Sequence, residues 1–219
     1  MNPAENILQI KKSIPKGVKI TAVSKTYSTE KIMQVYETGQ KIFGENKVQE
    51  LIKKYKLLPK DIEWHMIGHL QTNKVKQITP FVDTIQSVDS MKLLVEIDKQ
   101  AKKSNRIIKC LLQIHIAEEE TKFGLDLKEA EEILMSEELK TLANIQITGL
   151  MGMATLTDNQ HQIELEFKSI KNIFDRLKKT YQSLSTLSIG MSSDYAIAIS
   201  QGSNLVRIGS LIFGTRGYN

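Results

Sequence analysis

Residues 19–25 read KITAVSK, a short run of β-forming residues that ends on a lysine and is followed at once by Thr26, Tyr27 and Ser28. In α/β sheets and barrels, the chemistry lies at the carboxyl ends of the strands. A strand that ends on Lys25 therefore predicts an amine at the mouth of such a fold. The alternative is a lysine that ends a strand and solvates its ammonium group in water.

Apolar runs of strand length alternate with helix-patterned segments along the rest of the chain. We expect strands at residues 19–24, 41–44, 64–68, 84–88, 107–116, 145–153, 187–191 and 206–209. Strict alternation predicts parallel strands, because each parallel connection needs a crossover segment. Eight such units without a Pro/Gly/Ser linker favour a closed (β/α)8 TIM barrel that forms a single domain over residues 1–219. An open doubly wound sheet is the alternative.

In the segments between these runs, apolar residues recur at the spacing of a helix. The clearest stripe, at spacings of three and four, consists of Ile163, Phe167, Ile170, Phe174, Leu177 and Tyr181. Asp126 followed by Glu129 is typical of a capping box at a helix start. A short leading helix is expected over residues 5–12, and Gly202 is where a helix from Ser193 should stop. The stripe indicates a helix face that packs on a core.

Composition excludes several classes of protein. The 219-residue chain is 41% apolar and 25% charged, as is usual for a globular protein. Its net charge of +5 is modest and its lysines are spread along the chain, so we expect no nucleic-acid partner. No apolar run approaches the roughly 18 residues of a membrane span, and residues 1–12 lack the pattern of a signal peptide. We expect a cytoplasmic monomer without a membrane partner.

Cysteine and histidine content argues against a metal centre. The one cysteine, Cys110, lies in an apolar run, which excludes an intramolecular disulfide and predicts a buried thiol. Four histidines without acidic residues at ligand spacing predict no metal site. His65 and His69 are expected to frame the carboxyl end of the third strand, either as pocket residues or as structural polar groups.

Two small-residue junctions near the end of the chain suit a phosphate group. Residues 190–194 (GMSSD) follow the seventh predicted strand, and residues 207–210 (RIGS) follow the eighth. Barrels of this type commonly bind phosphate at these two loops. Backbone N–H groups at a helix start, the hydroxyls of Ser192 and Ser210, and the open backbone at Gly209 would hold a dianion. The alternative is a helix-capping serine and a turn glycine.

An amine that faces a phosphate site across a barrel mouth is the smallest set of groups that can hold pyridoxal 5'-phosphate (PLP). The aldehyde of this cofactor condenses with a lysine while its phosphate is held separately. Burial of Lys25 and the neighbouring cation Arg207 would favour the neutral, nucleophilic amine. A sugar-phosphate aldolase also uses a Schiff-base lysine in this fold, so these residues leave two chemistries open.

Six motifs in a fixed order resemble the pyridoxal phosphate homeostasis proteins, also called the YggS/PROSC family. These motifs are residues 22–25 (AVSK), 43–50 (FGENKVQE), 64–74 (WHMIGHLQTNK), 149–151 (GLM), 190–194 (GMSSD) and 206–210 (VRIGS). With residues 213–218 (FGTRGY), the resemblance spans nearly the whole chain. It implies a barrel like the N-terminal domain of bacterial alanine racemase, with PLP as an internal aldimine on Lys25.

The resemblance also implies roles for further residues. Ser192, Gly209 and Ser210 would hold the phosphate, and Arg207 would face the pyridine nitrogen. The other implied cofactor-binding residues are Asn46, Met151 and Lys122. Lys122 would lie near the ring hydroxyl, where the racemase has a basic residue. The alternatives are a helix cap for Asn46 and a solvated loop charge for Lys122.

Two positions depart from the related proteins. Met153 stands where alanine racemase places a ring-stacking histidine, which puts racemase-like ring packing in doubt. His115 stands where the family usually carries an asparagine, and we interpret it as a core histidine.

The resemblance favours a non-catalytic PLP-binding protein that contributes to vitamin B6 and amino-acid balance, with PLP-dependent apoenzymes as partners. A PLP-dependent racemase needs a second acid/base group on the other ring face, which alanine racemase takes from another domain and subunit. A weak amino-acid racemase is the alternative, with Tyr27, His65, His69 or Lys122 as that group. No residue is therefore assigned a catalytic role.

Overall fold

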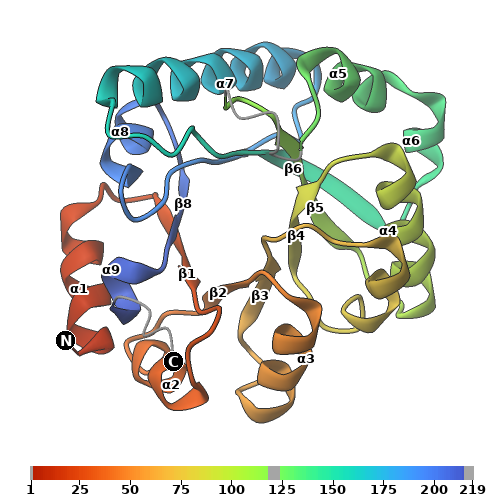
Figure 1. The fold of residues 1–219 in the computed structure, drawn as a ribbon. Helices are drawn as coiled ribbons and strands as arrows, with labels where there is room; N and C mark the ends of the chain where they lie inside the picture. The colour runs from red at the N-terminus through yellow and green to blue at the C-terminus, as the bar shows by residue number, and fades with distance from the viewer. Residues whose placement is uncertain (1, 118–123, 215–219) are drawn as a thin grey trace.

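The computed structural model describes residues 2–117 and 124–214, and within them eight parallel strands close into a barrel in chain order (Figure 1). Each strand pairs with the next, and the last pairs with the first, with Ala22 opposite Ile208. The strands are β1 Lys19–Val23, β2 Ile42–Glu45, β3 Glu63–Met66, β4 Thr84–Val88, β5 Ile108–Ile114, β6 Ile145–Gly152, β7 Thr186–Ser188 and β8 Leu205–Ile208. The predicted (β/α)8 barrel is confirmed.

Helices surround the barrel and provide the crossovers (Figure 1). They are α1 Pro3–Ser13, α2 Thr29–Tyr36, α3 Val48–Leu57, α4 Met91–Lys103, α5 Leu127–Met135, α6 Glu137–Thr141, α7 Gln160–Thr180, α8 Tyr195–Ser200 and α9 Ser210–Phe213. Between β3 and β4, a 3₁₀ helix, η1 Thr72–Gln77, replaces a full α-helix.

The predicted strand positions are confirmed, and the largest boundary difference lies at the seventh. There the prediction was residues 187–191, whereas β7 ends at Ser188. Gly190 explains the early end, because its φ of +95° turns the chain out of the sheet. A side chain at Gly190 would also collide with Ala198 Cβ, at 2.5 Å.

Helix packing follows the predicted patterns. On α7, five members of the stripe are buried, from Ile163 to Leu177, and Tyr181 is partly buried. The capping box is present: Asp126 Oδ1 accepts from Glu129 N–H, and Glu129 Oε2 accepts from Asp126 N–H. Cys110 is fully buried, and burial raises the pKa of its thiol. The sequence therefore placed the core correctly.

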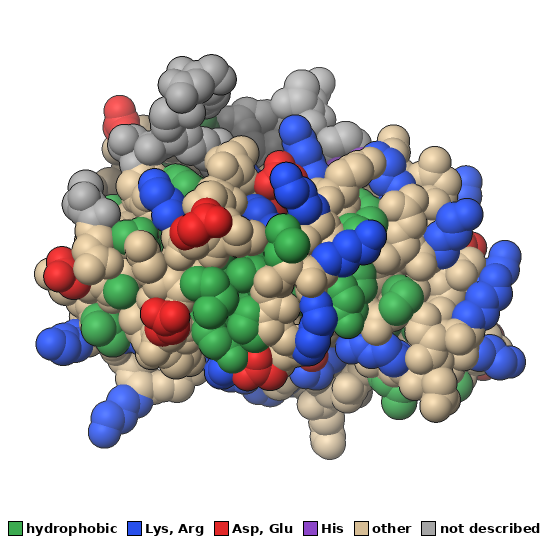
Figure 2. All heavy atoms as spheres, turned by 90° about the horizontal axis from the view of Figure 1, so that it is seen from below, with side chains coloured by type: hydrophobic (Ala, Val, Ile, Leu, Met, Phe, Trp, Pro, Cys, Tyr) green, Lys and Arg blue, Asp and Glu red, His purple; other side chains and the backbone are tan. Residues whose placement is uncertain are grey.

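The surface is mixed in charge. On the face seen in Figure 2, Lys and Arg side chains lie among acidic and apolar ones and do not form one basic patch. Across residues 2–117 and 124–214, no helix has both the length and the apolar character needed to cross a membrane.

Candidate functional site at the carboxyl mouth of the barrel

The loop after β1 holds Lys25 between two anchored residues. Before it, Ser24 donates its backbone N–H to Gly44 O at 3.0 Å and its hydroxyl to Glu45 Oε1 at 2.5 Å. After it, Thr26 has a φ of +71° and donates its N–H to Glu50 Oε2 at 2.9 Å. A threonine rarely adopts a positive φ, so the Glu50 contact fixes a turn that would otherwise be disfavoured. The partly buried Lys25 is thus carried on a defined turn.

A network of ion pairs between Lys54 and the carboxylates of Glu45 and Glu50 stabilises this turn. Lys54 of α3 donates to Ser24 O and Glu45 Oε1, both at 2.8 Å, and to Glu50 Oε2 at 3.3 Å. Glu45 is fully buried, and its Oε2 has no hydrogen-bond partner in the described part of the chain. We call Glu45, Glu50 and Lys54 the Lys54 network.

The pKa values of the two carboxyls in the Lys54 network move in opposite directions. Burial raises the pKa of Glu45 despite the charge of Lys54. Burial would also raise the pKa of Glu50, but the Thr26 N–H and Lys54 lower it. The difference follows from exposure, because the Glu50 side chain is 29% exposed and that of Glu45 is 0% exposed.

The two junctions near the chain end meet each other and the end of β1. Gly209 donates its N–H to Ser192 Oγ at 3.2 Å, which joins the loop after β8 to the loop after β7. A Cβ at Gly209 would lie 3.3 Å from Val23 O, so the backbone at this point runs close to β1. Ser210 is exposed and is the first residue of α9. The junctions that contain Ser192 and Gly209 are therefore in contact, and the binding of a phosphate there stays a prediction.

Tyr27 connects the Lys25 turn to the same corner. Its ring stacks on Phe213 with a centroid distance of 4.9 Å, and its hydroxyl donates to Gly214 O at 2.5 Å. The turn that carries Lys25 is consequently packed against α9.

Arg207 is on β8, two residues before Gly209, and it is buried in the barrel. The residue is 4% exposed, and its Nη1 donates to Ser188 O at 2.7 Å and to Ser188 Oγ at 2.8 Å. Its Nη2 donates to Gly152 O at 2.9 Å, at the carboxyl end of β6. Burial lowers the pKa of Arg207 to about 10, with the charge of Asp194 opposing that shift, so the guanidinium stays charged at neutral pH.

A chain of polar side chains leads from Arg207 through the barrel interior. Ser188 Oγ, which accepts from Arg207, donates to Gln86 Oε1 at 2.7 Å. Gln86 Nε2 lies 2.7 Å from His65 Nδ1. We call Arg207, Ser188, Gln86 and His65 the interior chain.

Asn46 and Met151 lie in different surroundings. Asn46 follows β2 and is partly buried, and Gly68 approaches it so closely that a Cβ there would lie 2.4 Å from Asn46 O. The N-cap of α3 is Lys47, so the helix-cap alternative for Asn46 does not apply. Met151 is fully buried and packs with Leu111 and Leu205 in the barrel interior. Its part in cofactor binding stays a prediction, and Lys122 lies outside the described residues.

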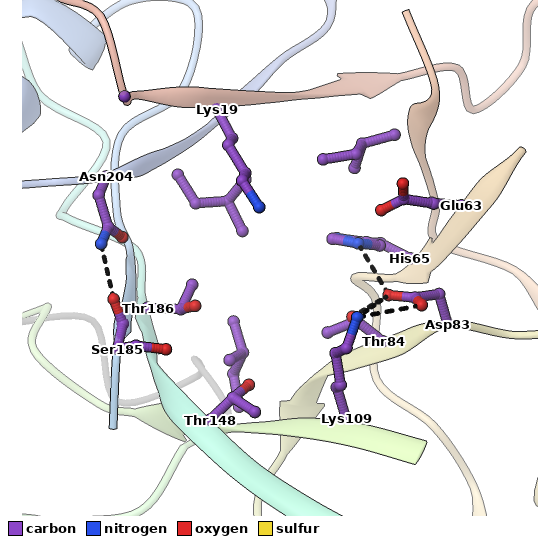
Figure 3. Close-up of a pocket in the computed structure, with 14 residues that line it drawn as sticks. Lys19, Glu63, His65, Asp83, Thr84, Lys109, Thr148, Ser185, Thr186 and Asn204 are labelled. Carbon is purple, nitrogen blue, oxygen red and sulfur yellow. Dashed lines mark hydrogen bonds and ion pairs between the residues drawn. The ribbon is translucent and has the colours of Figure 1, made fainter. Parts of the chain in front are cut away.

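The histidines are distributed differently from the prediction. His69 is at the carboxyl mouth, with Nδ1 3.1 Å from Asp89 Oδ2, and His115 is partly buried after β5. The placement of His65 at this mouth was wrong. Its side chain points toward the opposite end of the barrel, where it lines a cavity with Asp83 (Figure 3).

Sequence reasoning missed the Lys54 network and the interior chain. Glu50 and Lys54 stand four residues apart, which is typical of a helical ion pair and could have been noticed. Glu45, Gln86 and Ser188 are polar residues within apolar strands, and only the closed barrel shows which side chains they meet.

The fold and this mouth define a class of protein. A family model described as "Alanine racemase, N-terminal domain" matches residues 2–217. An alanine racemase from Clostridium difficile shares the fold, with a TM-score of 0.84 over 100% of this chain and 58% of that chain, at 16% identity. The molecule is thus a barrel of the alanine racemase N-terminal type.

Relatives with higher sequence identity show which family within this class the chain belongs to. A pyridoxal phosphate homeostasis protein from Aquifex aeolicus is 37% identical over 230 residues, 100% of both chains. One from Helicobacter pylori is 41% identical over 198 residues, 90% of this chain and 87% of the relative. The structure of PipY from Synechococcus elongatus, described with PLP bound, has a TM-score of 0.88 at 33% identity over 97% of this chain and 100% of that chain. The chain belongs to the pyridoxal phosphate homeostasis protein family.

Proposed function

We propose that this protein binds PLP through a covalent bond to Lys25 Nζ and serves as a carrier of the cofactor. The observation that supports this most directly is the meeting of three segments at one corner. The turn after β1 bears the amine, and the Ser192 and Gly209 junctions join at 3.2 Å beside the end of that strand. Two relatives are named for PLP homeostasis and a third is described with PLP bound, which agrees with this site.

The residues present fit the phosphate and ring of PLP. Gly209 has no side chain, and a Cβ there would lie 3.3 Å from Val23 O, so the backbone of this junction runs close to the end of β1. Ser192 and Ser210 add hydroxyl groups at the same place, as a phosphate site requires. When bound, PLP supplies an aldehyde that reacts with amines. Arg207 would hold a positive charge near the ring nitrogen, and Asn46 would lie beside the ring.

The surroundings of the candidate second acid/base groups favour a carrier over an enzyme. A racemase must move protons on both faces of the ring. The Tyr27 hydroxyl already donates to Gly214 O, His69 pairs with Asp89, and His65 points to the opposite end of the barrel. Lys122 lies outside the described residues. We therefore propose binding without turnover, and the alternative remains a racemase of low activity.

The proposed cellular role follows from reversible covalent binding. A carrier of this kind keeps a reactive aldehyde attached to protein and can release it to PLP-dependent apoenzymes. Release to apoenzymes, action in the cytoplasm and a monomeric state all stay predictions.

The proposal predicts that replacement of the amine abolishes covalent binding. Purified wild type mixed with PLP should gain a visible absorption band and, after borohydride reduction, a pyridoxyl mass on Lys25. Lys25→Ala should lose both signals, because the amine that forms the bond is gone. Lys47→Ala is the matched control, since Lys47 is an exposed lysine near the same mouth. A reduced adduct on any lysine of Lys25→Ala at wild-type yield would refute the assignment.

A separate assay tests the absence of turnover. L-alanine incubated with the PLP-loaded protein in heavy water should keep its α-proton at the rate seen with free PLP. Exchange that is faster by orders of magnitude and is lost in Lys25→Ala would establish the racemase instead.

A further inference from the structure

The amino-terminal mouth of the barrel, opposite the Lys25 corner, contains a cavity of about 300 Å³. It is lined by residues in the amino-terminal parts of the strands and just before them, and Figure 3 shows their side chains converging on it. Lys19, Glu63, His65, Asp83 and Lys109 provide its charged and titratable side chains. We call this cavity the amino-terminal cavity.

Three possible metal ligands lie on one side of the amino-terminal cavity. Glu63 and His65 are on β3, and Asp83 immediately precedes β4. One ligand atom from each residue lies within 4.8 Å of the other two. His65 Nε2 is 3.8 Å from Asp83 Oδ1. Two zinc ligands in a tetrahedral site are about 3.4 Å apart, since each lies about 2.1 Å from the metal. His65 and Asp83 are therefore almost at ligand spacing.

The orientation of His65 is the second observation that points to a ligand. Its side chain is 6% exposed, and Nε2 faces the amino-terminal cavity without a hydrogen bond to the described residues. Nδ1 is held by Gln86 at 2.7 Å, which fixes the ring plane. Metal-binding histidines are usually fixed in this way through the nitrogen that does not bind metal. A metal on Nε2 requires the proton on Nδ1, so the Gln86 amide must rotate to present its oxygen to Nδ1, and Gln86 Nε2 then donates to Ser188 Oγ in place of the hydrogen bond from Ser188 to Gln86 Oε1.

The two carboxylates complete the set. The exposed Glu63 side chain makes no hydrogen bond or ion pair with the described residues, so it is free to turn toward the other two. Asp83 pairs with Lys109 Nζ at 3.3 Å, but the Lys109 side chain is 51% exposed and can move into solvent. One imidazole and two carboxylates suit Zn²⁺, whereas Mg²⁺ favours oxygen ligands and retains its waters.

We propose that the amino-terminal cavity binds one divalent transition-metal cation of the Zn²⁺ type through His65 Nε2, Asp83 and Glu63. Such a cation joins the start of β3 to the residue before β4 and stabilises this end of the barrel. Lys109 competes with it for Asp83, and Lys19 adds positive charge nearby. The site therefore binds more weakly than the same ligands would without those lysines.

Calorimetric titration of chelator-treated protein with ZnCl₂ tests the proposal. Wild type should bind one Zn²⁺ per chain, and MgCl₂ under the same conditions should give no saturable heat. Glu63→Gln should weaken Zn²⁺ binding by at least about 10-fold, because loss of a residue that only supports a ligand already costs about 10- to 100-fold. Lys109→Met should tighten it several-fold, because the competing cation is removed. His161→Gln is the matched control, since His161 is exposed on α7, outside the amino-terminal cavity.

The variants also distinguish Zn²⁺ binding at this site from Zn²⁺ binding elsewhere on the protein. Glu63→Gln is decisive because it changes an exposed side chain without a partner among the described residues and should leave the fold intact. His65→Gln, which alters the interior chain, is interpreted only when its circular dichroism matches that of wild type. An absence of saturable Zn²⁺ binding in wild type would overturn the proposal. One-site binding that Glu63→Gln leaves unchanged, or that His161→Gln abolishes, would overturn it too.

Discussion

The two mouths of the barrel differ in how closely their polar side chains are spaced. At the carboxyl mouth, the Lys54 network fixes the turn that carries Lys25, and its ammonium makes contacts of 2.8–3.3 Å. At the amino-terminal mouth, His65 and Asp83 are 3.8 Å apart and line an open cavity. Closely spaced polar groups hold a backbone in place, whereas more widely spaced ones leave room for an added cation.

The interior chain connects these two regions. Arg207 is bound to Ser188 near the carboxyl mouth, and Gln86 joins Ser188 to His65 near the amino-terminal cavity. Four side chains therefore form a continuous polar connection between the two regions. Three substitutions test what the Lys54 network and the interior chain contribute to stability and PLP binding.

Loss of the Lys54 ammonium should have the largest effect. Lys54→Met leaves Glu45 buried without its cation, which typically costs on the order of 3–5 kcal/mol of unfolding free energy. It should also weaken PLP binding, because the Lys25 turn loses its support. Lys53→Met on the same helix is the matched control, since Lys53 is exposed. Urea unfolding measures the difference, and equal stability of the two variants would contradict the role given to the network.

Ser188→Ala should have an intermediate effect. The change leaves Gln86 Oε1 and one Arg207 N–H without their hydroxyl partner, at a cost of about 1–3 kcal/mol. Urea unfolding should show this loss, and titration with PLP should show weaker binding because Arg207 is held less firmly. Ser169→Ala, on the exposed face of α7, controls for removal of a hydroxyl. Unchanged stability and PLP affinity would contradict the support that Ser188 is proposed to give to Arg207 and Gln86.

A smaller effect is expected from pH at Glu45. Its pKa is raised in the folded protein by burial, so the folded state binds the proton more tightly than the unfolded state does. This contribution to stability is fully present below the unfolded pKa and is lost as pH rises through the folded pKa. A tenfold difference in proton affinity between the two states corresponds to about 1.4 kcal/mol of unfolding free energy. Glu45→Gln keeps the contacts of Oε1 and removes the titration.

Unfolding measured from about pH 4 to about pH 8 checks this. The stability of Glu45→Gln relative to wild type should rise with pH across that range. A relative stability that stays constant or falls would contradict the raised pKa and show that Lys54 governs this carboxyl.

Much of the fold could be predicted because apolar residues recur along each helix and strand at a regular spacing, which places them on its buried face. The predicted 84–88 strand matches β4 without change, and the α7 stripe is buried as its spacing required. The junction residues Ser192 and Gly209 were also predictable, since a barrel brings the ends of neighbouring strands to one corner.

The position of His65 could not be predicted in the same way. A strand residue points either into the barrel or out of it, and the level at which its side chain lies depends on the stagger between strands. His65 stands opposite Gly44 and Thr84, a register that places its ring toward the amino-terminal mouth. The sequence motif around it suggested the other end.

The sequence by itself determined the barrel, the family and the position of Lys25 just after β1, because these depend on periodicity and on motifs that are local in the chain. Only the tertiary structure decided which buried polar groups meet. Glu45 with Lys54, Arg207 with Ser188, and His65 with Asp83 are contacts between separate elements. Such pairs depend on the register and closure of the sheet, which a linear pattern does not encode.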